Sequence, residues 1–95
     1  MARADMQSFE MTRVGDTAHI GAAMASADAL FQLGLQYSLG RDVDADAVTA
    51  HKWFNLAALR GNQAAKEYRA EIAADMTRAQ VAEAQKRARE WLKGN

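Results

Sequence analysis

A chain of 95 residues is long enough for one small domain, and its 12 basic and 12 acidic side chains leave no net charge at pH 7. This balance gives no long-range attraction toward nucleic acid or an anionic membrane, and the absence of cysteine excludes disulfides and thiolate metal sites. The opening MARADMQSFE places charges where a signal peptide has an apolar core, and no run reaches the roughly 18 apolar residues of a membrane span. These features predict a soluble, cytoplasmic protein.

The composition favours helices throughout the chain. Proline is absent, strong helix formers are abundant, and no stretch alternates between apolar and polar residues as a strand does. We therefore predict an all-α fold. Residues 1–25 have the weakest pattern. AHIGAAMA, at 18–25, is compatible with one further helix, while Met6, Phe9 and Met11 either pack on the body or belong to a loose arm.

The first clear helix is predicted to begin after Ser26, a good N-cap residue, and to end at Gly40, because glycine adopts the left-handed conformation of a helix terminus at little cost. Phe31 and Leu35 widen its apolar face, so we expect this helix to contact at least two others. The centre of that face consists of Leu30, Leu33, Gly34 and Tyr37, at i, i+3, i+4 and i+7.

The second helix follows the loop RDVDAD, at 41–46, in which Val43 is predicted to turn inward and Asp46 to cap the helix. Its two aromatic residues precede two alanines, a surface that lets a partner helix approach closely near its end. Gly61 ends the helix. The apolar stripe consists of Ala50, Trp53, Phe54, Ala57 and Ala58.

Two further helices are predicted. Asn62 is suited to cap the third, at about 63–75, and the sequence TRAQ, at 77–80, is a capping box for the fourth. The inner face of the third is predicted to hold Ala65, Tyr68, Ile72 and Met76. The fourth presents Val81, Ala84, Ala88, Trp91 and Leu92 on one face and Glu83, Lys86, Arg87 and Glu90 on the other.

The order and spacing of these small, aromatic and turn residues resemble the Sel-one-like repeat (SLR) family, a relative of the tetratricopeptide repeat. Asp42 stands where that family usually has a second glycine; aspartate tolerates the left-handed conformation better than most residues. The resemblance is carried by Ala29, Leu33, Gly34, Tyr37, Gly40, Val43, Asp46, Ala50, Trp53, Ala57, Ala58 and Gly61.

The resemblance covers one complete repeat, at residues 26–61. It implies a short tetratricopeptide-like array in which residues 1–25 are a degenerate N-terminal segment and residues 62–95 are a degenerate half-repeat helix followed by a C-terminal capping helix. The family implies a non-catalytic protein-binding scaffold whose partner is another protein or peptide. Because solenoids need about three repeats to be stable alone, we also expect either a homodimer or closure of one open end by residues 1–25.

Other functions have weaker support in the sequence. The helical spacing of Trp53 is typical of a core residue and not of an exposed ligand platform. His19 and His51 form no ligand pair at metal-binding spacing, and the acidic loop 42–46 lacks the ligand order of a calcium loop, so no metal, cofactor or catalytic residue is predicted. The basic QKRARE, at 85–90, is flanked by Glu83 and contains Glu90, which argues against nucleic-acid binding. A small helical nucleic-acid-associated regulator and a purely structural oligomer remain the alternatives.

The binding surface is predicted along the outer side of the first helix. In tetratricopeptide-like arrays the first helices of successive repeats line the binding face, so this side and the third helix should meet. Amides and charges at helical spacing suit hydrogen bonding to an extended peptide, with an apolar side chain as anchor. The predicted partner-binding residues are Phe31, Gln32, Leu35 and Gln36, with Lys66 and Arg69 across from them.

Overall fold

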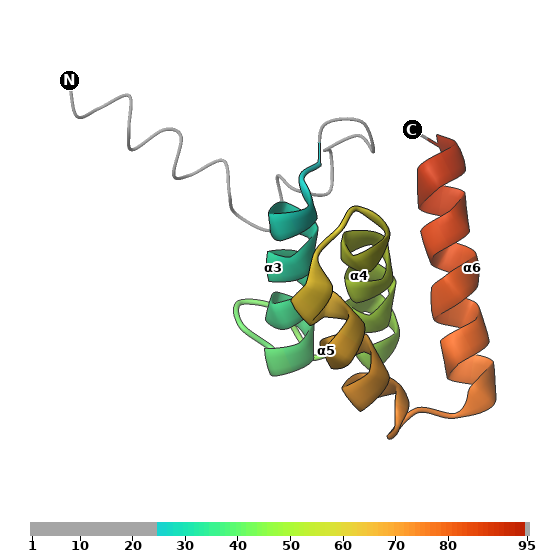
Figure 1. Cartoon of the computed structure of the whole chain (residues 1–95). Helices are drawn as coiled ribbons and strands as arrows, with labels where there is room; N and C mark the ends of the chain where they lie inside the picture. The colour runs from blue at the N-terminus through green and yellow to red at the C-terminus, as the bar shows by residue number, and fades with distance from the viewer. Residues whose placement is uncertain (1–24, 95) are drawn as a thin grey trace.

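The computed structural model of the protein describes residues 25–94, which form four helices: α3 (Ala27–Leu39), α4 (Ala47–Leu59), α5 (Gln63–Ala73) and α6 (Arg78–Gly94). Figure 1 shows α3 and α5 running in one direction and α4 and α6 in the other. Because this part of the chain contains no strand, the all-α prediction is confirmed for it. No helix among these residues is both long and apolar enough to cross a membrane. The helix expected at 18–25 lies, except for Ala25, outside the described residues.

Each helix begins at the residue that the sequence predicted, because a side-chain oxygen there accepts an otherwise unpaired backbone N–H. Ser26 Oγ accepts from Ala29 N at 3.0 Å, Asp46 Oδ1 from Thr49 N at 3.1 Å, and Asn62 Oδ1 from Ala65 N at 2.9 Å. The capping box before α6 is reciprocal: Thr77 N donates to Gln80 Oε1 at 2.8 Å, and Gln80 N donates to Thr77 Oγ1 at 3.0 Å.

The loop between α3 and α4 contains two left-handed residues. Gly40 has a φ of 72° and donates its N–H to the carbonyl of Gln36 at 2.9 Å, which ends α3 as predicted. Asp42 has a φ of 62°, in the left-handed region that aspartate tolerates better than most residues. Val43, predicted to turn inward, is half-buried.

The helix α4 is the centre of the fold, since it packs against α3, α5 and α6. Its contact with α3 is the most extensive, and it is close because Gly34 has no side chain. A Cβ placed there would come closer than 3.0 Å to two carbons of the Phe54 ring. The helices α5 and α6 share no contact of comparable extent; both pack on α4. The described chain is therefore one tight helical hairpin with two further helices added to it.

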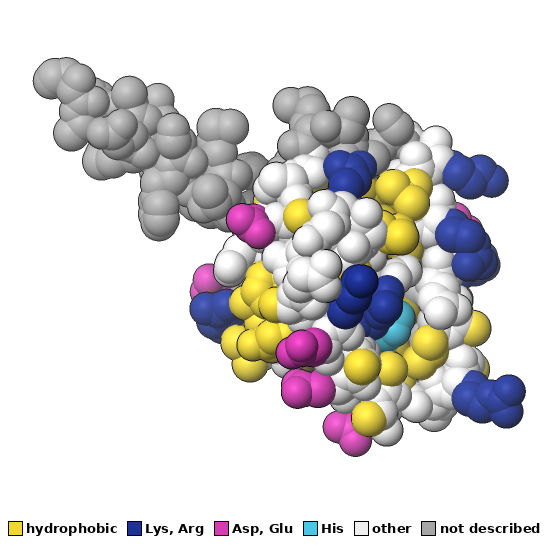
Figure 2. Space-filling model, in the orientation of Figure 1, with side chains coloured by type: hydrophobic (Ala, Val, Ile, Leu, Met, Phe, Trp, Pro, Cys, Tyr) yellow, Lys and Arg dark blue, Asp and Glu magenta, His cyan; other side chains and the backbone are white. Residues whose placement is uncertain are grey.

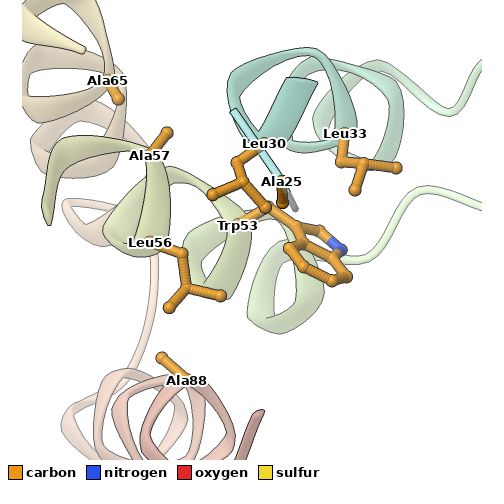
Figure 3. Close-up of a cluster of buried hydrophobic side chains, with 8 residues drawn as sticks. All are labelled: Ala25, Leu30, Leu33, Trp53, Leu56, Ala57, Ala65 and Ala88. Carbon is orange, nitrogen blue, oxygen red and sulfur yellow. The ribbon is translucent and has the colours of Figure 1, made fainter. Parts of the chain in front are cut away.

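The apolar core lies around α4. Trp53 is only 6% exposed, and its ring meets that of Trp91 edge to face with centroids 5.5 Å apart. Its predicted place in the core is thus confirmed. Figure 3 shows Trp53 beside Leu30 and Leu33, with Leu56 pointing toward Ala88 of α6. The buried cluster consists of Ala25, Leu30, Leu33, Trp53, Leu56, Ala57, Ala65 and Ala88.

Tyr68 faces inward as predicted, since its ring contacts two phenylalanines, but it remains 41% exposed. Two sequence-based predictions need correction. The third helix ends at Ala73, two residues before its predicted end, because a turn at 74–76 leads into the capping box. Leu92, predicted on the inner face of α6, is 39% exposed because it lies near the end of a helix that extends past its neighbour.

Candidate interaction surface

Three aromatic rings from three helices meet where α3 and α5 come together. Phe31 of α3 lies edge to face with Tyr68 of α5, with centroids 5.2 Å apart. Phe54 of α4 lies beneath both, 5.8 Å from Phe31 and 5.5 Å from Tyr68. Such pairs stabilise a contact beyond the burial of their area. This cluster confirms that α3 contacts two other helices and that Phe31 faces the third predicted helix.

Apolar side chains continue from this cluster toward the C-terminal ends of both helices. Leu35 and Leu39 follow Phe31 at i+4 and i+8, so they extend one stripe along α3. Leu35 is half-buried, whereas Leu39 is 63% exposed. On α5, Ile72 follows Tyr68 at i+4. We call these five residues the α3–α5 surface. Figure 2 shows hydrophobic side chains gathered on this side of the molecule. It is an apolar surface that the described residues leave partly uncovered.

A cleft of about 350 Å³ continues this surface, where all four helices have a terminus. Ile72 belongs to both the surface and the cleft, and Ser38 joins the cleft to α3. Two carboxylates, those of Asp46 and Asp75, line it. The lining residues are Ser38, Ala45, Asp46, Ala47, Ile72, Asp75, Met76 and Gln80.

The Asp46 carboxylate in this cleft is held ionised. Burial by itself would raise its pKa, but hydrogen bonds from the backbone and hydroxyl of Thr49, together with the positive charge of Arg87, lower the pKa below its ordinary value. The Thr49 hydroxyl donates to Oδ2 at 2.9 Å. One wall of the cleft therefore carries a full negative charge at neutral pH.

The structure separates the residues predicted to bind a partner. Gln32 is exposed and Gln36 is half-buried on α3, beside the α3–α5 surface. Arg69 instead contacts α4, where its Nη1 donates to Asn55 Oδ1 at 2.6 Å. Lys66 shares this side of α5, since it precedes Arg69 by three residues. The grouping of Lys66 and Arg69 with the glutamines is corrected: Tyr68 and Ile72 are the α5 residues that face α3.

Sequence reasoning missed the polar residues buried along α4. His51 is buried and its Nδ1 has no hydrogen-bond partner among the described residues. Burial, followed by the positive charge of Arg69, lowers its pKa, so the ring is neutral at pH 7. The pKa of Lys52 is also lowered, first by burial and then by Arg87, while its Nζ lies 4.1 Å from the centroid of the Trp53 ring. The i, i+4 spacing of His51 and Asn55 places both on one face of α4, and this pattern could have predicted a polar contact with another helix.

The fourth helix presents a solvated charged face, as its pattern predicted. Arg87 Nε donates to Glu83 Oε2 at 2.8 Å, and this pairing lowers the pKa of Glu83. Within residues 25–94, no group of three or more histidine or acidic side chains is arranged to hold a metal ion. Comparisons with protein-family models, with curated proteins and with solved structures found no match to this chain.

Proposed function

We propose that this protein is a non-catalytic protein-binding module of the Sel-one-like type and that the α3–α5 surface is where it binds. The single observation that carries the proposal is the exposed apolar stripe, in which Leu39 and Tyr68 remain 63% and 41% exposed beside a buried aromatic cluster. Large apolar side chains that gather on one side of a small domain are typical of interaction sites. Tyrosine is also among the side chains that contribute most to protein interfaces.

Local geometry gives the family resemblance physical support. Gly34 stands where the ring of Phe54 leaves no room for a side chain, and Gly40 stands at a positive φ. Asp46 caps the second helix. In each case the residue that carries the resemblance has a structural reason to be that residue. The resemblance implies an interaction scaffold. We also propose that the helical hairpins of this protein are arranged as a short solenoid.

The rim of the surface suits a peptide. Gln32 and Gln36, at i, i+4, offer amide donors and acceptors beside an apolar floor. An extended or helical segment could place one apolar side chain against Tyr68 and form hydrogen bonds with these amides. Because Phe31 is already packed between two aromatic rings, the floor is rigid before a partner binds. A rigid floor lowers the entropic cost of association.

The experiment is affinity capture from an extract of the organism that encodes the chain, using three immobilised full-length proteins. Leu39→Glu places a charge on the proposed surface, and Leu59→Glu is the matched control, since Leu59 is equally exposed at 65% but lies at the end of α4. We expect wild type and Leu59→Glu to capture a protein that Leu39→Glu does not. If all three capture the same proteins, or none is captured, the proposed surface is wrong.

A further inference from the structure

We propose that the partner segment bound by the α3–α5 surface is basic: an apolar side chain of the partner packs on Tyr68, and a lysine or arginine of the partner enters the cleft between Asp46 and Asp75. This inference rests on the proposed function, because it assigns the chemistry of the segment that the same surface would bind. It is carried by where the acidic side chains lie relative to the apolar ones.

Acidic residues follow the aromatic cluster along α5. Glu71 lies at i+3 from Tyr68, so these two residues share one face of α5, and Asp75 lies in the turn two residues past the end of the helix. Asp75 lines the cleft. Figure 2 shows acidic side chains next to the hydrophobic ones on this side of the molecule. The apolar floor therefore leads directly to carboxylates.

Only Asp46 of these carboxylates lies close enough to a described cation, Arg87, for its pKa to be lowered by it. Among residues 25–94, neither Glu71 nor Asp75 forms a salt bridge, and the donors to Asp46 belong to Thr49, which is neutral. The loop beside the cleft adds Asp42 and Asp44 against Arg41 alone. The basic residues of α5, Lys66 and Arg69, lie on its other side. Negative charge is left for a partner to neutralise, and complementary charge of this kind increases the rate and specificity of association.

The distance between Tyr68 and Asp75 determines how far apart the apolar and basic residues of the partner segment must be. Tyr68 and Asp75 are seven residues apart, five of them in α5 and two in the turn that follows, which is about 11 Å at 1.5 Å per helical residue and about 2.0 Å per residue of a turn with i→i−3 hydrogen bonds. A docked helix spans that distance between residues i and i+7, and an extended peptide between residues i and i+3. The partner is therefore a segment whose apolar anchor and basic residue have one of these two spacings.

Charge disfavours one other occupant and leaves a second to be distinguished by experiment. Residues 1–24 contain Arg3 and Arg13 against Asp5, Glu10 and Asp16, a net side-chain charge of −1, so charge favours this segment less than it favours a basic partner. The helix α6 of a second copy is basic and is the competing occupant that the test must distinguish. Its charged residues are Arg78, Lys86, Arg87, Arg89 and Lys93, against Glu83 and Glu90.

The experiment measures binding of three synthetic peptides of equal length to the full-length protein by isothermal titration calorimetry. Each carries leucine at i, and at i+7 one carries lysine, one glutamine and one glutamate. We expect affinity to decrease in that order. Glu71→Gln with Asp75→Asn should weaken binding of the lysine peptide about tenfold, whereas Glu83→Gln with Glu90→Gln on α6, which removes the same charge, should not. Asp46 is left unchanged because it caps α4.

Failure of this inference is distinguishable from failure of the proposed function. If the lysine and glutamine peptides bind equally and Leu39→Glu abolishes both, the surface binds apolar segments, and the basic assignment is wrong. If none of the peptides binds, the basic assignment is also wrong, and the capture experiment alone decides the proposed function. If the unliganded protein sediments as an oligomer that Glu71→Gln with Asp75→Asn dissociates, the occupant is a second copy and not another protein.

Discussion

The ring of Phe54 lies against the backbone of Gly34 so closely that no side chain fits between them. Phe54 is fully buried beneath Phe31 and Tyr68, so its ring has no free space into which it could move. The close crossing of α3 and α4 depends on this pair. The Phe54 ring also supports Phe31 and Tyr68, the two aromatic residues of the α3–α5 surface.

Gly34→Ala should therefore destabilise the fold even though alanine is the better helix former. The substitution gains about 1 kcal/mol of helix propensity but overpacks the crossing at a cost of about 1–3 kcal/mol. We expect a net loss of about 1 kcal/mol in urea unfolding. Combining it with Phe54→Leu should lose less than the two single variants together, because the smaller side chain relieves the contact. Strict additivity would show that the two residues do not restrict each other.

Trp53→Ala should remove the largest side chain of the core. Its loss costs about 3–5 kcal/mol, which is comparable with the whole stability of a domain of this size. The contact with Trp91 is lost as well. We expect circular dichroism to show a largely unfolded or molten protein. Leu59→Ala, at a 65% exposed position, should stay within about 0.5 kcal/mol of wild type. A Trp53→Ala variant that melts within a few degrees of wild type would contradict the described packing.

His51 should make the fold sensitive to mild acid. Because burial lowers its pKa in the folded state from the ordinary 6.5, the unfolded chain binds the proton more readily. The stability associated with neutral His51 is therefore fully present above pH 6.5. It decreases as the pH falls from 6.5 to the lower pKa of the folded state. The slope cannot exceed about 1.4 kcal/mol per pH unit for one proton. His51→Gln should flatten this part of the stability curve. Parallel curves for the two proteins, or an ordinary His51 pKa by NMR titration, would exclude the effect.

Asp46→Ala should destabilise α4 by about 1 kcal/mol, because it removes the acceptor of the Thr49 N–H. Asp44→Ala is the control, since Asp44 is exposed in the same loop and has the same charge. The stability that Asp46 contributes should be present above pH 3.8 and be lost as the pH falls through its lower folded pKa. Urea unfolding at neutral pH should separate the two variants. If the two variants lost the same stability, the loss would be due to the removed loop charge and not to the removed cap.

Gln32→Glu with Gln36→Glu should leave the fold intact and strengthen binding of a basic partner segment. Both glutamines lie on α3 beside the α3–α5 surface, and changes at such positions usually alter stability by at most about 0.5 kcal/mol. Because the proposed partner segment is basic, the two added carboxylates should increase its affinity through charge complementarity. A loss of affinity would show instead that hydrogen bonds donated by the amides dominate, since carboxylate oxygens cannot donate. Gln63→Glu, at the start of α5, controls for charge alone. Unchanged affinity would place the binding site on another face.

Much of the fold follows from local chemistry in the sequence. The capping residues Ser26, Asp46, Asn62 and Thr77 each accept from a backbone N–H three residues away, so their roles do not depend on the rest of the molecule. The positive φ of Gly40 is local in the same sense. Helical spacing alone was sufficient to place the apolar face around Trp53 in the core, because burying that stripe is the main driving force for folding.

The position of α5 on α4 was decided by tertiary packing alone. Helical spacing showed that Tyr68 and Arg69 point in different directions, but it contained no information on which side would face α3. The rotation of α5 about its axis is set by Ala65, which packs without exposure in the core, and by the Phe54 ring beneath Tyr68. That rotation brings Arg69 to Asn55 and leaves Tyr68 toward α3. The cleft has the same origin, since its residues come from the ends of four helices far apart in sequence, and only their packing brings Asp46 and Asp75 to one site.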